Sequence, residues 1–174
     1  MPRNWLTSAP CLVWASLPYD IPDGGAFACL GAGDEGCLFI DLGAAPGPVA
    51  IGGDHQAAVR LAESIMHQLC TAEAADRTCT VVVVGDAFPE PLPSAAAWAP
   101  SLRDLGAAPP PGDGTEVVFC QLHSSEDAFA LDRYVSSAQR RVIPVVLANL
   151  PDAPWSLTAQ PSRHPNQALH SVIA

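Results

Sequence analysis

Cys120 and His123 are the two residues whose types and spacing best suit covalent chemistry, because a thiol needs a nearby base to become a nucleophile. Asp86, which follows another apolar run, supplies the carboxylate that we expect near them. These three residues predict, as an alternative function, a small hydrolase or transferase. Two features weaken that prediction: no glycine-rich elbow that opens a helix directly follows Cys120, and the sequence identifies no residue that would orient the base.

A glycine-rich turn at Gly52-Gly53-Asp54 is the second place where chemistry is possible. It joins an expected strand at 48–52 to an expected helix at 54–71, and the amides and dipole of such a helix N-terminus bind phosphate in many α/β proteins. Asp54, however, places a carboxylate in the turn, where it repels an anion and suits the N-cap position of the helix. We therefore expect a tight connection without a ligand.

The same segment lacks the side chains of a nucleotide-binding loop. In the motif G-x-x-x-x-G-K-[ST], the lysine grips the phosphates and the hydroxyl residue binds magnesium. When the motif is aligned on Gly52, its second glycine, its lysine and its hydroxyl residue are replaced by Ala57, Ala58 and Val59. The dinucleotide fingerprint G-x-G-x-x-G is missing as well, so the sequence predicts no cofactor.

His67 and Cys70 lie one helical turn apart and are the pair best spaced to share a metal ion. No C-x-x-C pair or H-x₃₋₅-H pair completes a zinc set, so we expect no metal site. Asp41 and Asp86 each follow an apolar run, and both would lie at the carboxyl edge of a parallel sheet, where open α/β proteins bind ligands. A single acid at a strand end is more often a turn or cap residue.

Alternating strand and helix patterns would position these residues. The expected helix at 54–71 has apolar residues at three- and four-residue spacing, and the four valines at 81–84 are typical of a strand buried on both faces. Pro144 would place its strand at an edge or a bulge, and the basic pair Arg140-Arg141 suits the end of a helix. Further strands are expected at 37–42, 48–52, 116–120, 142–148 and 155–159. Further helices are expected at 125–140 and, as a short helix broken near Pro100, at 94–105.

This alternation predicts an α/β fold with a doubly wound, mostly parallel sheet and flanking helices. We expect an irregular N-terminal segment at 1–35, with one strand at 26–30, packed on an α/β domain at 36–160. Residues 161–174 are expected to form a tail. A length of 174 residues suits one core of this kind.

The composition excludes several functions. The chain has 18 acidic residues, 8 basic residues that are all arginine, and a net charge of −10. The missing lysine removes Schiff-base chemistry, and the acidic balance argues against nucleic acid and anionic membranes as partners. The N-terminal residues show no sustained apolar run typical of a secretory signal, so we expect a cytoplasmic protein whose six cysteines are reduced.

In the order of its segments, the chain resembles a degenerate P-loop-like α/β domain. Such domains occur in large actinobacterial proteins with LysM or transcriptional-activator modules, and they are similar to inactive motor domains of FtsK/SpoIIIE-type secretion ATPases. The resemblance covers about residues 26–159 and implies a P-loop-NTPase-like layout without a functional P-loop. The segments that carry it are Leu38-Phe39-Ile40-Asp41-Leu42, Val49-Ala50-Ile51-Gly52-Gly53-Asp54, an alanine-rich helix, Val81-Val82-Val83-Val84-Gly85, a further strand-helix unit and Ala153-Pro154-Trp155-Ser156-Leu157.

Together these observations predict a non-catalytic α/β domain that regulates or scaffolds a larger bacterial assembly. It would act through protein–protein contacts, without nucleic acid, membrane insertion, cofactor or metal.

Overall fold

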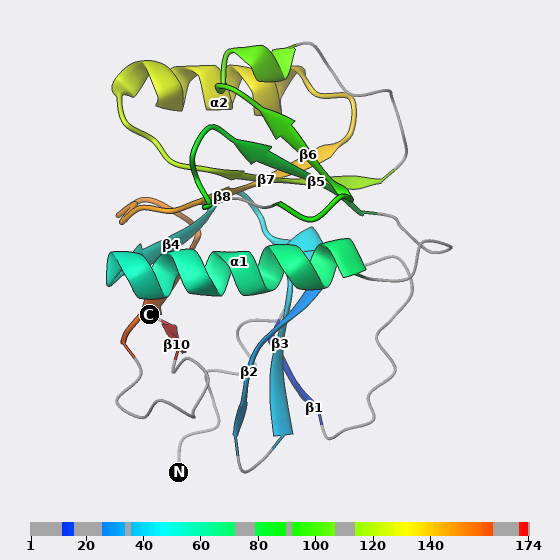
Figure 1. The fold of residues 1–174 in the computed structure, drawn as a ribbon, viewed down its shortest axis with the longest axis vertical. Helices are drawn as coiled ribbons and strands as arrows, with labels where there is room; N and C mark the ends of the chain where they lie inside the picture. Colours follow the sequence, from blue (N-terminus) through cyan, green and yellow to red (C-terminus); the bar gives the residue numbers. More distant parts are fainter. Residues whose placement is uncertain are drawn as a thin grey trace.

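A seven-stranded, mostly parallel β-sheet forms the centre of the fold (Figure 1). The computed structural model describes residues 12–15, 26–33, 36–71, 79–89, 92–106, 114–161 and 171–173 of the chain. In spatial order, the strands of this sheet are β10 (Ser171–Ile173), β9 (Trp155–Ala159), β4 (Val49–Gly53), β8 (Arg141–Val146), β7 (Thr115–Cys120), β5 (Cys79–Val84) and β6 (Ala96–Ala99).

The six strands from β9 to β6 all run parallel, and only β10 is antiparallel to its neighbour. Helix α1 (His55–Thr71) covers one face of the sheet and helix α2 (Ser125–Ser137) covers the other (Figure 1). The predicted doubly wound α/β fold is therefore confirmed. Because all six strands point the same way, the segments that follow β4, β5, β7 and β8 meet at one carboxyl edge.

Helix α1 forms where the apolar spacing predicts it. Asp54 caps its first turn, because the Asp54 Oδ1 atom accepts a hydrogen bond of 2.9 Å from the backbone N–H of Ala57. One stripe of the helix is buried against the inner strands, whose valines leave no room for solvent on either face. The buried residues of α1 are Ala57, Ala58, Leu61, Ala62, Ile65, Met66, Leu69 and Cys70.

A second, antiparallel sheet lies beyond α1, on the side away from the large sheet (Figure 1). It consists of β1 (Leu12–Ala15), β3 (Gly36–Asp41) and β2 (Phe27–Gly33), in that spatial order, and a short 3₁₀ helix, η1 (Leu42–Ala44), follows β3. Gln68 of α1 joins this sheet to the core: its side chain accepts from the N–H of Cys29 at 2.6 Å and donates to the carbonyl of Cys29 at 2.9 Å. Segment 1–35, expected to hold one strand, thus contributes two.

The helix expected at 94–105 is wrong, because residues 96–99 form strand β6, which pairs in parallel with β5. Pro100 explains the difference: a proline biases the preceding residue toward an extended backbone and blocks a helix through this segment. A short 3₁₀ helix, η3 (Asp104–Gly106), is all that remains of it. The indole N–H of Trp98 on β6 donates to the carbonyl of Gly85 at 3.0 Å.

Three further expectations about the C-terminal half need correction. Helix α2 ends at Ser137 rather than at residue 140, so Arg140 lies beyond the helix and pairs with a buried carboxylate instead. The strand that holds Pro144 is central, between β4 and β7, and its pairing with β4 begins only after the proline, at Val145. Within the expected tail, residues 171–173 form β10.

Candidate functional site

The carboxyl edge of the large sheet brings together several residues that sequence reasoning singled out. The Gly52-Gly53-Asp54 turn begins with the last two residues of β4, and Asp86 and His123 follow β5 and β7. Asn149, which no motif indicated, follows β8 and reaches this same edge. In a doubly wound fold this is the edge where ligands bind, so its geometry decides what the site can do.

Asn149 fills the space above the glycine turn. A Cβ atom placed on Gly52 would lie 1.8 Å from the Asn149 Oδ1 atom, which leaves no room for any side chain at residue 52 while Asn149 keeps this position. The same oxygen accepts a hydrogen bond of 3.2 Å from the N–H of Gly53. A side chain that is 96 positions away in the sequence therefore occupies the cradle that a phosphate would need.

The remaining amides of the turn also have partners within the chain. The N–H of Asp54 donates to the carbonyl of Ala159 at 3.0 Å, and the N–H of Ala58 donates to the carbonyl of Asp54 at 2.8 Å. With the bond from Ala57 to the Asp54 carboxylate, four backbone donors at or near the helix start, those of residues 53, 54, 57 and 58, are satisfied internally. Gly53 adopts a φ of +94°, so the turn uses glycine to close tightly against β9.

The two positions where a nucleotide-binding loop carries its lysine and hydroxyl residue are inside the helix. Ala58 is buried in the core, and Val59 is partly buried and packs against it. Neither side chain can bind an anion or a magnesium ion. The turn is therefore a tight strand-to-helix connection with a carboxylate at its centre.

Asp86 and His123 do come together at the carboxyl edge. The His123 Nε2 atom lies 3.9 Å from the Asp86 Oδ1 atom, although both side chains are largely exposed, at 66% and 92%. The capping of α2 fixes the backbone of His123: its N–H donates to Asp127 Oδ2 at 3.0 Å, while the N–H of Asp127 donates to Ser124 Oγ at 3.2 Å. The bond from the His123 amide is the main cause of the lowered pKa of Asp127.

Cys120 does not join this pair as a nucleophile. It is the last residue of β7 and is fully buried among the residues that pack under α2. Burial raises the pKa of its thiol to about 12, and the negative charge of Asp127 adds to that shift. A reactive cysteine needs a lowered pKa and access to solvent, and Cys120 has neither.

The other candidate metal or ligand residues are dispersed. His67 is exposed whereas Cys70 is buried, and no group of three metal-ligating side chains occurs among the described residues. Asp41 ends β3 in the antiparallel sheet, so its expected place at the carboxyl edge of the parallel sheet is wrong. The strand at 36–41 pairs with β1 and β2, which removes Asp41 from the ligand edge.

A buried polar cluster under α2 was not predicted. Glu116 of β7 is fully buried and accepts a hydrogen bond of 2.5 Å from the hydroxyl of Tyr134, and its other oxygen pairs with Arg140. Burial raises the pKa of the Tyr134 hydroxyl and lowers the pKa of the Arg140 guanidinium. A charged residue next to the apolar run Val117–Cys120 was the one sequence signal that could have indicated this cluster.

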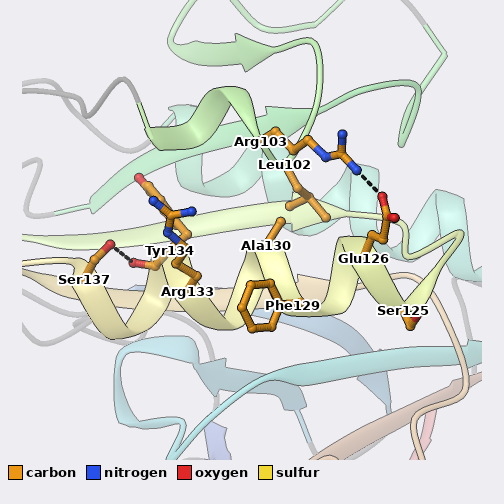
Figure 2. A pocket seen from close by; sticks show the side chains of 9 residues that line it. All are labelled: Leu102, Arg103, Ser125, Glu126, Phe129, Ala130, Arg133, Tyr134 and Ser137. Atoms are coloured by element: carbon orange, nitrogen blue, oxygen red, sulfur yellow. Dashed lines mark hydrogen bonds and ion pairs between the residues drawn. The ribbon is translucent and has the colours of Figure 1, made fainter.

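A cavity of about 670 Å³ is lined jointly by α2 and by the segment before η3 (Figure 2). We call it the α2 pocket. It is lined by Leu102 and Arg103 from the segment before η3 and by Glu126, Phe129, Ala130 and Arg133 of α2. Figure 2 shows the ion pair between Arg103 and Glu126 at one end of this pocket and Arg133 toward the other.

No model of a known protein family matches the chain, and no curated protein or solved structure matches it either. Within the part of the chain that the structure describes, no helix is long and apolar enough to cross a membrane.

Proposed function

We propose that this chain is a non-catalytic α/β domain that regulates or scaffolds a larger bacterial assembly through protein–protein contacts. The observation that carries the proposal is the closed turn after β4. The place where an α/β fold of this layout binds phosphate holds the side chain of Asn149, and the neighbouring amides bond to Ala159 and Asp54. A domain that keeps this α/β layout but fills its phosphate site with its own side chain is suited to binding another protein rather than to catalysing a reaction on a nucleotide.

Two further features support this proposal. The layout of a central parallel strand, a glycine turn and a helix agrees with the resemblance to degenerate P-loop domains, whose fold persists without nucleotide chemistry. The net charge of −10 favours a protein partner over nucleic acid.

Calorimetric titration of the full chain with ATP and magnesium tests the proposal directly. We expect no binding heat at millimolar nucleotide and no release of phosphate. Micromolar affinity or measurable hydrolysis would overturn the proposal. A companion titration of the Asp54→Asn variant, which removes the carboxylate from the turn but keeps a capping side chain, reveals whether any such affinity belongs to this turn.

The alternative function, a small hydrolase or transferase, rests on the 3.9 Å approach of His123 to Asp86. Its nucleophile is the weak part, because Cys120 is buried and its pKa is raised to about 12. Alkylation of the native chain at neutral pH distinguishes the two functions. We expect Cys120 to react far more slowly than a free thiol, and rapid modification that also abolishes an esterase activity would favour the alternative.

A further inference from the structure

The α2 pocket combines an apolar floor with an exposed aromatic ring. Leu102 is buried at its base, Ala130 is partly buried beside it, and Phe129 leaves 70% of its surface exposed. Figure 2 shows Ala130 directed toward Leu102, with the ring of Phe129 on the neighbouring side of the helix. An apolar side chain placed here would remove the ring of Phe129 from water, which is favourable.

The charge of the pocket is opposite to that of the chain. Its lining carries the guanidinium groups of Arg103 and Arg133 but only one carboxylate, that of Glu126, whereas the whole chain has a net charge of −10. Two of the eight basic residues therefore lie beside the one exposed phenylalanine on α2. The lining is complementary to a ligand that carries carboxylates next to an apolar group.

Arg103 keeps the capacity to bind a second carboxylate. Its pair with Glu126 is exposed on both sides, at 70% and 72%, and an ion pair in water contributes little and is readily shared. A guanidinium has five N–H donors in a planar fork, and Glu126 uses only one of its nitrogens here. Arg133 is exposed on the same face of α2, one turn after Phe129.

We infer that the α2 pocket binds an acidic segment of a partner protein. An aliphatic or aromatic side chain of that segment would pack against Phe129, Ala130 and Leu102, and flanking carboxylates would pair with Arg103 and Arg133. Glu126, Phe129, Ala130 and Arg133 lie on one helical face, so a helix or an extended strand laid along α2 meets them in order. This inference rests on the proposed contact function and names the surface and the partner chemistry.

Selection from a random peptide library displayed on phage, with the purified full chain as target, tests the inference. We expect the recovered peptides to be rich in aspartate and glutamate around one or two large apolar residues. Their affinity, measured by fluorescence anisotropy on synthetic copies, should fall about tenfold or more in Phe129→Ala and in the double variant Arg103→Glu/Arg133→Glu. It should also decrease as salt is raised.

Matched controls separate this surface from the rest of the molecule. Arg60→Glu reverses an exposed arginine on α1, on the opposite face of the sheet, and Trp98→Ala removes the other large exposed aromatic side chain among the residues that the structure describes. Neither change should alter peptide affinity. Recovery of basic peptides, of peptides that bind the pocket variants equally, or of no peptides would overturn the inference. So would self-association of the chain that Phe129→Ala abolishes, because the occupant would then be a second copy.

These outcomes are independent of the nucleotide test. If the titration shows no nucleotide binding and the selection fails, the acidic-peptide site is wrong and the proposed non-catalytic function is unaffected. If the chain binds nucleotide and the selection succeeds, the non-catalytic function is wrong and the acidic-peptide site is supported.

Discussion

The Asn149 side chain and Gly52 occupy one space: the Oδ1 atom of Asn149 lies where the Cβ atom of any other residue at position 52 would be. The same oxygen bonds the amide of Gly53, so the contact both fills the turn and removes a donor from it. This relationship explains why residue 52 is a glycine although the turn does not bind phosphate through it.

Substitutions at Gly52 and Gly53 should distinguish a clash with the Asn149 side chain from a clash with the Ala159 backbone. We expect Gly52→Ala to destabilise the chain by about 1–3 kcal/mol through overpacking, and Asn149→Ala by about 1 kcal/mol through one lost hydrogen bond. In the double variant the clash is relieved, so its cost should approach that of Asn149→Ala alone. Urea denaturation followed by tryptophan fluorescence measures the coupling, and strictly additive costs would contradict the shared space.

Gly53→Ala provides the matched comparison. A Cβ atom there would lie 2.2 Å from the backbone carbonyl oxygen of Ala159, at a φ of +94°. Because backbone cannot rotate away as a side chain does, we expect a loss of about 3 kcal/mol or more that Asn149→Ala does not rescue. Partial rescue would mean that β9 moves more easily than its pairing with β4 indicates.

The buried cluster of Glu116, Tyr134 and Arg140 should be the most sensitive polar feature of the fold. Arg140→Ala leaves the fully buried Glu116 carboxylate without its ion pair, and we expect a loss of about 3–5 kcal/mol. Tyr134→Phe removes one hydrogen bond to the same carboxylate and should cost about 1–3 kcal/mol. Arg103→Ala, which breaks the exposed pair with Glu126, is the control and should cost at most about 1 kcal/mol in the same denaturation experiment.

Alkaline pH should destabilise the chain through its buried thiols. The folded Cys120 thiol keeps its proton up to a pKa of about 12, whereas the ordinary thiol loses it at a pKa of 9.0. Between these values the folded state binds more protons than the unfolded state, so the free energy of unfolding falls as pH rises. Denaturation at several pH values should give a shallower fall for Cys120→Ala than for the unmodified chain, and parallel curves would contradict this origin.

Gln68 should stabilise the contact between α1 and the antiparallel sheet. Gln68→Ala removes both of its bonds to the backbone of Cys29, at 2.6 and 2.9 Å, and we expect a loss of about 1–2 kcal/mol together with faster hydrogen exchange at the Cys29 amide. Gln68→Glu keeps the acceptor and loses the donor, so its effect should be intermediate. Gln56→Ala, an exposed change on the same helix, should leave both measurements unchanged.

The elements that the sequence predicted well have strong local patterns. The valine run at 81–84 and the apolar spacing along α1 each depend on neighbouring residues, and both elements form where expected. Strand β6 has no such pattern: its sequence, Ala-Ala-Trp-Ala, lacks β-branched residues, and it becomes a strand by pairing with β5. Pro144 misled the placement of its strand for a similar reason, since sheet order is a tertiary property.

In the candidate site, too, the features that depend on neighbouring residues could be predicted, and those that depend on tertiary contacts could not. The missing lysine at Ala58 and the capping role of Asp54 could be predicted, because both follow from the motif and from the helix start. The contact of Asn149 with the turn could not be predicted, because it depends on the pairing of β8 with β4, which are far apart in the sequence. The approach of His123 to Asp86 could be expected, but the burial of Cys120 needed the position of α2 over its strand.

The position of β4 has a consequence for how the chain is made. Val49 pairs on one side with Val145 and on the other with Trp155, so the earliest strand of the parallel sheet gains its neighbours about a hundred residues later. During synthesis, the two hydrogen-bonding edges of β4 therefore have no partner strands until β8 and β9 have been made. Nascent chains that end before β9 should therefore be captured by chaperones, and folding should be completed late and in one cooperative step.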